Sequence, residues 1–133
     1  MIYIETNSTD VFYNFAVEHY LAAVKPREEM LFLLWRTTPT LMIGKYQNPY
    51  EEIDVAYAKE QGIEIVRRPS GGGTIFTDLG GWQFSFIDPD GAQEIEFSKY
   101  TGPILDALQA LGVPVTFTGR NDLLVDGKKI SGN

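Results

Sequence analysis

Residues 63–77 read Ile-Glu-Ile-Val-Arg-Arg-Pro-Ser-Gly-Gly-Gly-Thr-Ile-Phe-Thr, and this stretch decides what kind of fold the chain can adopt. Its apolar ends predict two short strands, at 63–66 and 74–77. The segment between them, Arg67 to Gly73, combines a proline with three glycines and is therefore expected to be an irregular loop. The sequence thus predicts two strands joined by a long and basic connection.

Hydrophobic patterns on both sides of this unit predict further strands interleaved with helices. Helices are expected at about 10–24, 51–61 and 98–111. Further strands are expected at 1–4, 30–36, 40–44, 82–87, 113–118, 122–125 and 129–131. The predicted hairpins are 30–36 with 40–44, 74–77 with 82–87, and 122–125 with 129–131 through Asp126-Gly127. This mixture of connections predicts an α/β or α+β domain, a mixed sheet flanked by helices.

Four side chains refine this scheme. Ser98 is expected to cap the last helix, with Pro103 in its first turn, where a missing backbone N–H is tolerated. Trp35 and Trp82 are expected in the core, with a place at the border of the binding pocket as the alternative for Trp82.

Composition narrows the range of functions. The chain has 133 residues, of which 44% are hydrophobic, and its formal net charge is −7. We expect one globular domain, and the acidic balance argues against nucleic acid or a membrane as a partner. The chain contains no cysteine, which excludes a cysteine nucleophile or thiolate metal site within it and suits a cytoplasmic location. The single histidine, His19, leaves no multi-histidine metal site.

The loop from Arg67 to Gly73 is the first candidate site. Three glycines let the backbone adopt positive φ and let a ligand approach bare amide groups, while paired arginines offer planar donors for phosphate or carboxylate. It is not a Walker A loop, because no Gly-Lys-Ser/Thr follows the glycines. The plainer interpretation is a flexible connector with a solvated arginine pair.

The second candidate site is the hairpin at 119–133. Asn121 and Asp122 at a strand start can ligate Mg²⁺ or hold a phosphate through it, and a strand lysine can stabilise charge on a transferring oxygen. Because side chains alternate along a strand, Lys128 and Lys129 are expected to point to opposite faces, with Lys128 in solvent. The plainer interpretation is a lysine pair on a solvated edge. Together the two motifs hold five of the chain's 11 basic residues, Arg67, Arg68, Arg120, Lys128 and Lys129, which indicates a dedicated anion site.

These motifs resemble those of the lipoate–protein ligase A family over nearly the whole chain. Residues 67–76 with Asp78-Leu79-Gly80 resemble the family's lipoate- and nucleotide-binding loop. The segments 119–123 and 129–133 resemble its second signature, with the catalytic lysine at Lys129. Weaker support comes from Asn14, Ala16 and Glu18, from Trp35-Arg36, and from 43–49.

The resemblance implies a two-step reaction and a fold like that of class II aminoacyl-tRNA synthetases and biotin ligases. Lipoate would attack the α-phosphate of ATP, with Mg²⁺, to give lipoyl-adenylate and pyrophosphate. A lysine on a lipoyl-carrier domain would then release AMP. The implied partners are lipoyl domains of 2-oxoacid dehydrogenase E2 subunits or the glycine cleavage H protein.

By the same resemblance, Lys129 is the catalytic residue and Asn121 and Asp122 face the phosphates, with Asp122 a possible Mg²⁺ ligand. The implied lipoate and ATP groove is lined by Arg68, Ser70, Gly71, Gly72, Gly73, Thr74, Ile75, Phe76, Thr77 and Asp78. Two positions depart from the family's pattern: Thr77 stands where histidine is usual, and Gly81 where asparagine is usual.

Three alternatives stay open. Octanoyltransferases share the fold but use a cysteine in a later part of it, biotin ligases order their glycine–arginine loop differently, and a binding module would hold lipoate or an adenylate without turnover. The family's catalytic domain continues past Lys129, so residues 1–133 are expected to be its N-terminal part and inactive in isolation.

Overall fold

Strand pairing arranges the chain into three small sheets of three strands each, with the orders β1-β2-β6, β4-β3-β5 and β7-β8-β9. The computed structural model describes residues 1–24, 28–91, 96–118 and 122–132. The chain forms two compact units, Met1–Pro89 and Asp90–Asn133, and each is described by itself. The expected mixed α/β class is confirmed, with small sheets in place of one continuous sheet.

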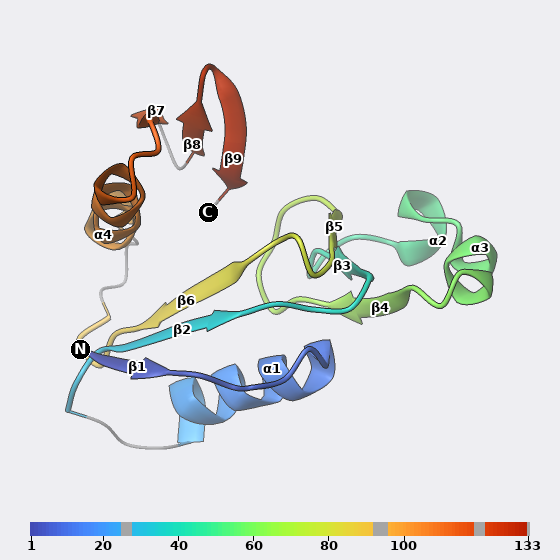
Figure 1. Cartoon of the computed structure of the whole chain (residues 1–133). Coiled ribbons are helices and arrows are strands. Elements are labelled where there is room, and N and C mark those ends of the chain that lie inside the picture. The colour runs from blue at the N-terminus through green and yellow to red at the C-terminus, as the bar shows by residue number, and fades with distance from the viewer. Residues whose placement is uncertain (25–27, 92–95, 119–121, 133) are drawn as a thin grey trace. The chain divides into compact units, whose positions relative to one another are not determined.

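The first sheet has β2 (Leu31–Trp35) at its centre, parallel to β1 (Ile2–Ile4) and antiparallel to β6 (Gln83–Ile87). Helix α1 (Val11–His19) lies along this sheet in Figure 1 and continues as a π-helical turn, η1 (Tyr20–Val24). The helix begins where expected because the Asp10 carboxylate caps it: the carboxylate accepts hydrogen bonds from backbone N–H groups in the first turn of the helix.

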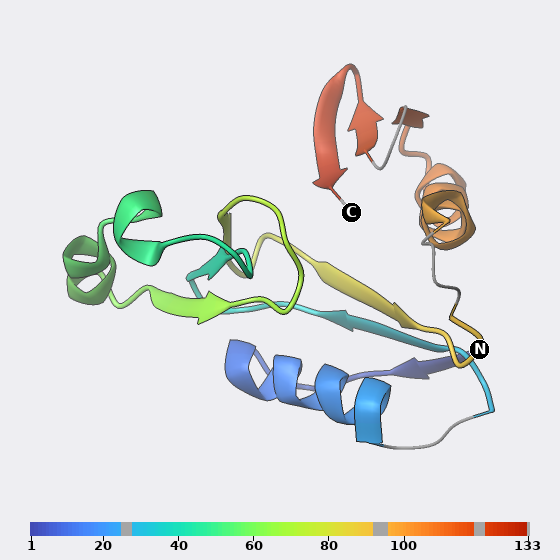
Figure 2. The same cartoon turned by 180° about the vertical axis from the view of Figure 1, so that it is seen from behind.

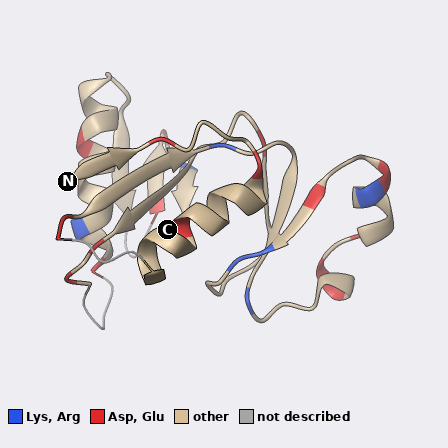
Figure 3. Ribbon diagram, turned by 90° about the horizontal axis from the view of Figure 1, so that it is seen from below, with Lys and Arg blue, Asp and Glu red and all other residues tan. Residues whose placement is uncertain are grey.

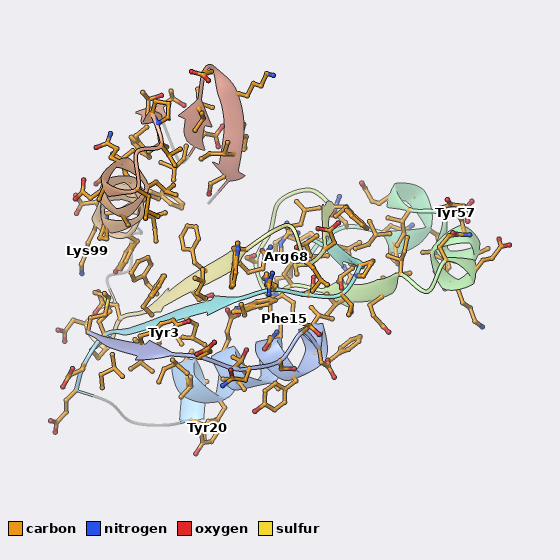
Figure 4. All side chains as sticks on the ribbon, viewed as in Figure 1. Tyr3, Phe15, Tyr20, Tyr57, Arg68 and Lys99 are labelled. Carbon is orange, nitrogen blue, oxygen red and sulfur yellow. The ribbon has the colours of Figure 1, made fainter. Side chains whose placement is uncertain are left out.

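Alternation along β2 builds the core of this unit. Leu31, Leu33 and Trp35 face α1 and are buried, together with Val11, Leu21, Met42 and Val66. Phe15 of α1 meets Trp35 edge to face, with ring centroids 5.4 Å apart, and its label in Figure 4 lies beside α1 and β2. Burying a leucine of this kind contributes about 1.5–3 kcal/mol. The core therefore anchors α1 to the sheet, and the predicted burial of Trp35 is confirmed.

The second sheet has β3 (Thr40–Ile43) at its centre, parallel to β4 (Glu64–Arg67) and antiparallel to β5 (Ile75–Thr77). Two short helices, α2 (Pro49–Glu52) and α3 (Val55–Glu60), connect β3 to β4, where one helix over 51–61 was expected. The helix is broken because the Asp54 side chain accepts from Tyr57 N at 2.9 Å and starts a new helix there.

Two of the three predicted hairpins are wrong. Strand β2 pairs with β6, and β3 pairs with β5, so 31–43 and 75–87 form one long antiparallel ribbon that passes from the first sheet into the second, as Figure 2 shows from behind. The reason lies at 36–39: Thr37 is fully buried, and Thr38 N donates to Thr9 O at 3.1 Å. Because of these contacts, the chain continues from the first sheet into the second and does not form a hairpin.

The second unit contains α4 (Phe97–Ala110), β7 (Val115–Thr118), β8 (Asp122–Val125) and β9 (Lys128–Gly132), with β8 antiparallel to both neighbours. Val115 and Leu123 are its buried apolar residues. The predicted Asp126-Gly127 hairpin is confirmed, with φ of 49° and 75° at the two turn residues.

Three expectations about side chains are wrong. Helix α4 begins after Glu96, whose carboxylate accepts from Ser98 Oγ, so Ser98 lies inside the helix and does not cap it. Pro103 lies in the helix interior and not in the first turn. Trp82 is 54% exposed because it precedes β6, where the Arg36 guanidinium stacks 4.5 Å from the centroid of its ring.

The helices of the described residues are short or polar. None of them is both long and apolar enough to cross a bilayer.

Candidate functional site

The glycine loop, defined as 68–74 between β4 and β5, is placed by the parallel pairing of β3 and β4. Their last pair is Ile43 with Arg67, so the loop begins beside the turn that follows β3, at 44–47. Backbone bonds join the two segments: Arg68 N donates to Ile43 O at 2.9 Å, and Lys45 N donates to Ser70 O at 2.9 Å. In Figure 3 basic positions gather along these neighbouring segments.

Both arginines of the loop motif donate to backbone carbonyls. Arg67 Nη1 reaches the carbonyls of Gly44, Lys45 and Gln47 at 2.9, 3.2 and 2.8 Å. Arg68 Nη1 donates to Met42 O at 2.7 Å, and its Nη2 donates to the carbonyls of Gly71 and Gly73 at 2.9 and 2.7 Å. Arg68 is labelled among these segments in Figure 4. The two arginines therefore fix the conformation of the 44–47 turn and of the glycine loop. A flexible connector with solvated arginines would not be held in this way.

The direction of these carbonyls decides what the glycine loop offers to a ligand. In a trans peptide the C=O and the following N–H point in opposite directions, and no described peptide bond is cis. Because the carbonyls of Gly71 and Gly73 point at Arg68, the amides of Gly72 and Thr74 point away from it. Backbone amides of this kind, on two alternate residues of the loop, are donors that an anion can use.

Gly44 and Gln47 are residues whose importance the sequence reasoning missed. A Cβ on Gly44 would lie 2.0 Å from the carbonyl oxygen of Gly72, so the two backbones touch and no larger residue fits. Gln47 Oε1 accepts from Gly44 N at 2.8 Å and from Thr74 Oγ1 at 2.9 Å, which ties the turn to the far end of the loop. The 43–49 segment was used only as support for the resemblance, although it builds half of this region.

The remaining predicted loop residues fall into two groups. Ile75 and Phe76 of β5 are exposed, at 43% and 56%. Thr77 is 5% exposed and its Oγ1 accepts from Gln83 Nε2 at 3.0 Å, so the hydroxyl faces the interior. The Asp78 carboxylate accepts from Gly80 N at 2.8 Å and closes the turn before β6.

The lysine hairpin, β8 with β9, belongs to the second compact unit. Lys129 Nζ lies 2.8 Å from Asp122 Oδ1. Lys128 pairs with Val125 and is exposed on the opposite face, as expected. The structure thus brings together the predicted catalytic lysine and one of the two predicted polar residues beside it. The predicted residues Asn121, Arg120 and Gly119, and Asn133 of the second signature, lie outside the described residues.

Among the described residues, the possible Mg²⁺ ligand Asp122 stands without a cluster of further ligands. Within the described parts of the chain, no three His, Cys, Asp or Glu side chains cluster as metal ligands do. Asp122 offers one carboxylate, and one of its oxygens is paired with Lys129. These residues alone do not make up an Mg²⁺ site.

A polar cluster under α1 contains a carboxyl group whose pKa is shifted. Glu18 Oε1 accepts from Trp35 Nε1 at 2.8 Å and from the Ser85 hydroxyl. Burial raises the pKa of the Glu18 carboxyl, and the hydrogen bonds from Ser85 and Trp35 oppose that rise.

Comparison with known proteins connects these features. Residues 10–133 match the model of the lipoyl protein ligase A/B catalytic domain. The chain is 44% identical over 135 residues to the lipoate-protein ligase LplJ of Bacillus subtilis (strain 168), covering 100% of this chain and 41% of that protein. It is 46% identical over 128 residues to lipoate–protein ligase 1 of Staphylococcus aureus (strain Mu50), covering 96% of this chain and 39% of that one. The chain therefore spans about two-fifths of the length of these relatives.

Solved structures agree with this assignment. The structure of P. falciparum LipL1 in complex with lipoate superposes with a TM-score of 0.86 at 28% identity, over 98% of this chain and 42% of that chain. An archaeal bi-partite lipoate protein ligase from Thermoplasma acidophilum, described with its E2 lipoyl domain, gives 0.80 at 24% identity, over 98% and 53%. Lipoate-protein ligase A bound with ATP gives 0.79 at 23%, over 99% and 57%. The last two show the fold alone. On the family match, this chain belongs to the lipoyl protein ligase A/B catalytic-domain family.

Proposed function

We propose that this chain supplies part of the catalytic domain of an enzyme that activates lipoate with ATP and transfers it to a lysine of a lipoyl-carrier domain. The observation that carries the proposal is the arginine-held glycine loop with outward amides, in a chain 44% and 46% identical to two lipoate–protein ligases. Support for the two ligands comes from similar solved structures, one in complex with lipoate and one bound with ATP.

The proposed chemistry has two displacement steps. A lipoate carboxylate oxygen attacks the α-phosphorus of ATP, and the bond to the β-phosphate breaks with release of pyrophosphate. The amine of the acceptor lysine then attacks the acyl carbon of lipoyl-adenylate, AMP leaves with the bonding electron pair, and the amine proton passes to solvent. Negative charge on the α-phosphoryl oxygens grows during the first step, so fixed donors that face it lower the barrier.

The residues take the following proposed roles. The outward amides of Gly72 and Thr74 hold oxygens of the adenylate, and Arg68 acts through the loop that it organises. Lys129 contacts the carboxyl and phosphoryl centre. ATP enters with Mg²⁺, and Asn121 and Asp122 face its phosphates. The proposed groove continues along Ser70, Gly71, Gly73, Ile75, Phe76 and Asp78, and the buried Thr77 supports it from below.

The proposed acceptors are lipoyl domains of 2-oxoacid dehydrogenase E2 subunits or the glycine cleavage H protein, in the cytoplasm. A similar archaeal ligase described with its E2 lipoyl domain supports the first acceptor. Residues 1–133 are proposed to need further sequence for turnover, because the relatives are longer.

The test is lipoate-dependent exchange of labelled pyrophosphate into ATP by the full-length protein, followed by AMP release when a lipoyl domain is added. Exchange that requires lipoate and ATP supports the ligase. ATP-independent transfer from an octanoyl carrier would instead identify an octanoyltransferase. Tight lipoate binding without exchange would identify a binding module, the alternative that Thr77 in place of histidine leaves open.

A further inference from the structure

Strand β9 is irregular at the catalytic lysine. Lys129 is paired with Leu124 and Ser131 with Leu123, so Ile130 is one extra residue, a β-bulge, in β9. In a regular strand, residues three apart point to opposite faces. The bulge cancels this alternation and puts Lys129 on the same face as Gly132, which is paired with Asp122.

Gly132 has no side chain, and this leaves room for the side chain of Lys129. A Cβ at Gly132 would lie 3.0 Å from both Cε and Nζ of Lys129, so the end of the lysine side chain would have to shift by a few tenths of an ångström. The lysine tail therefore runs over the bare backbone of Gly132, and its amine ends 2.8 Å from Asp122 Oδ1. Two features of β9, the bulge and the missing side chain, together aim this amine at one carboxylate.

The ion pair adds little to the stability of the hairpin. The Lys129 and Asp122 side chains are 56% and 33% exposed, and pairs in such settings are screened by solvent. The flexible four-carbon side chain of Lys129 loses conformational entropy when it is held in one conformation. Because the folded protein already holds it, this entropy is not lost on reaching the transition state. The contact with Asp122 Oδ1 is an ion pair, and an ammonium group has three N–H donors to offer to a substrate oxygen.

We propose that Asp122 is a positioning residue that holds the Lys129 amine for the reaction, with the Ile130 bulge and Gly132 as the backbone features that permit it. This inference rests on the proposed function. It also gives Asp122 a role other than Mg²⁺ ligand, because a bound cation at the same oxygen would repel the lysine ammonium.

The test compares Asp122→Asn, Gly132→Ala and the double variant in the pyrophosphate exchange assay. Each single change is expected to lower kcat about tenfold with little change in KM, because the amine acts on developing charge. Since both changes act through the same amine, the double variant is expected to lose about tenfold and not about a hundredfold. Asp126→Asn, which removes a carboxylate at the turn of the same hairpin, is the matched control and is expected within about twofold of the parent.

A second measurement follows the Lys129 ammonium group by nitrogen–proton NMR in the full-length protein, assigned by its loss in Lys129→Arg. The signal is expected to shift in Asp122→Asn and in Gly132→Ala, and to stay in place in Asp126→Asn. A multiplicative loss in the double variant, recovery of Asp122→Asn at high Mg²⁺, or an unmoved lysine signal would overturn the proposal. If the parent protein shows no lipoate-dependent exchange, the proposed function fails, and the NMR comparison still tests the pair.

Discussion

The glycine loop and the lysine hairpin are both basic, yet they hold their charges in different ways. Arg67 and Arg68 each donate to three backbone carbonyls, so both guanidinium groups are fixed to the backbone, Arg67 to the 44–47 turn and Arg68 to Met42 and the glycine loop. Lys129 has one ion pair with Asp122, and more than half of its side chain is exposed.

The difference indicates that the arginines shape the backbone, whereas the lysine supplies charge to the reaction. A planar guanidinium can bridge several carbonyls at fixed angles, so arginine suits the construction of a backbone cradle. An ammonium on a flexible stem can exchange partners, so lysine suits a group that follows charge from ground state to transition state. We therefore expect changes in the loop to alter binding and local stability together, and changes in the hairpin to alter the rate alone.

The largest expected effect is that of Lys129→Ala. Removing the amine should lower adenylate formation by at least about a hundredfold, the usual cost of one donor at developing charge, with no loss of thermal stability. Pyrophosphate exchange and thermal unfolding measure the two quantities. Lys128→Ala on the opposite face is the control and should leave both unchanged. If Lys129→Ala keeps activity within about tenfold of the parent, the role assigned to Lys129 is wrong.

Arg68→Lys is expected to have the next largest effect. Lysine keeps the charge but cannot reach Met42 O, Gly71 O and Gly73 O together, so the loop amides should lose their common orientation. Exchange assays should show KM for ATP or lipoate raised by about tenfold or more, unlike the rate effect at Lys129. Arg36→Lys, at an arginine outside both segments, is the charge-matched control. An unchanged KM in Arg68→Lys would mean that the charge at this position is enough, and that Arg68 is not needed to shape the loop.

Gly44→Ala tests the contact between the loop and its neighbouring turn. The added carbon would lie 2.0 Å from Gly72 O, and because both partners are backbone, the loop itself must move. Overpacking of this kind costs about 1–3 kcal/mol of unfolding free energy. Denaturant unfolding measures the loss, and Gly73→Ala, where a Cβ meets nothing within 4 Å, is the control. Equal stability of the two variants would mean that the turn and the loop are not in firm contact.

Local chemistry could be predicted from the sequence, and long-range pairing could not. Asp126-Gly127 specifies its turn through its own backbone preferences, so that hairpin was found. The pairing of β2 with β6 joins segments about fifty residues apart, and the nearby Thr40–Ile43 strand has the same apolar character. Nothing in the local pattern tells these two partners apart.

The candidate site shows a similar division. The residue types predict an anion site at both motifs, because arginine, glycine and lysine are the residues that such sites use. The partners of Arg68 could not be predicted, since a guanidinium donates equally well to a phosphate or to a carbonyl. The bulge at Ile130 could not be predicted either, because the sequence of β9 carries no local signal for an extra residue and predicts regular alternation.

The smallest expected effect comes from Glu18→Gln, a change outside both basic regions. The raised pKa of Glu18 means that the folded state binds its proton more tightly than the unfolded state does. Stability from this group is therefore full at pH values below the unfolded pKa and is lost as the pH rises through the folded pKa. Glutamine keeps an acceptor for Trp35 and Ser85 but carries no charge. Glu18→Gln should thus raise Tm at pH 7, with the gain shrinking toward pH 4. Glu51→Gln, at an exposed position in α2, is the control and should show no such trend. If the gain at pH 7 comes with a changed KM, the α1 core and the glycine loop are coupled, and the loop is not the self-contained cradle that its arginine bonds indicate.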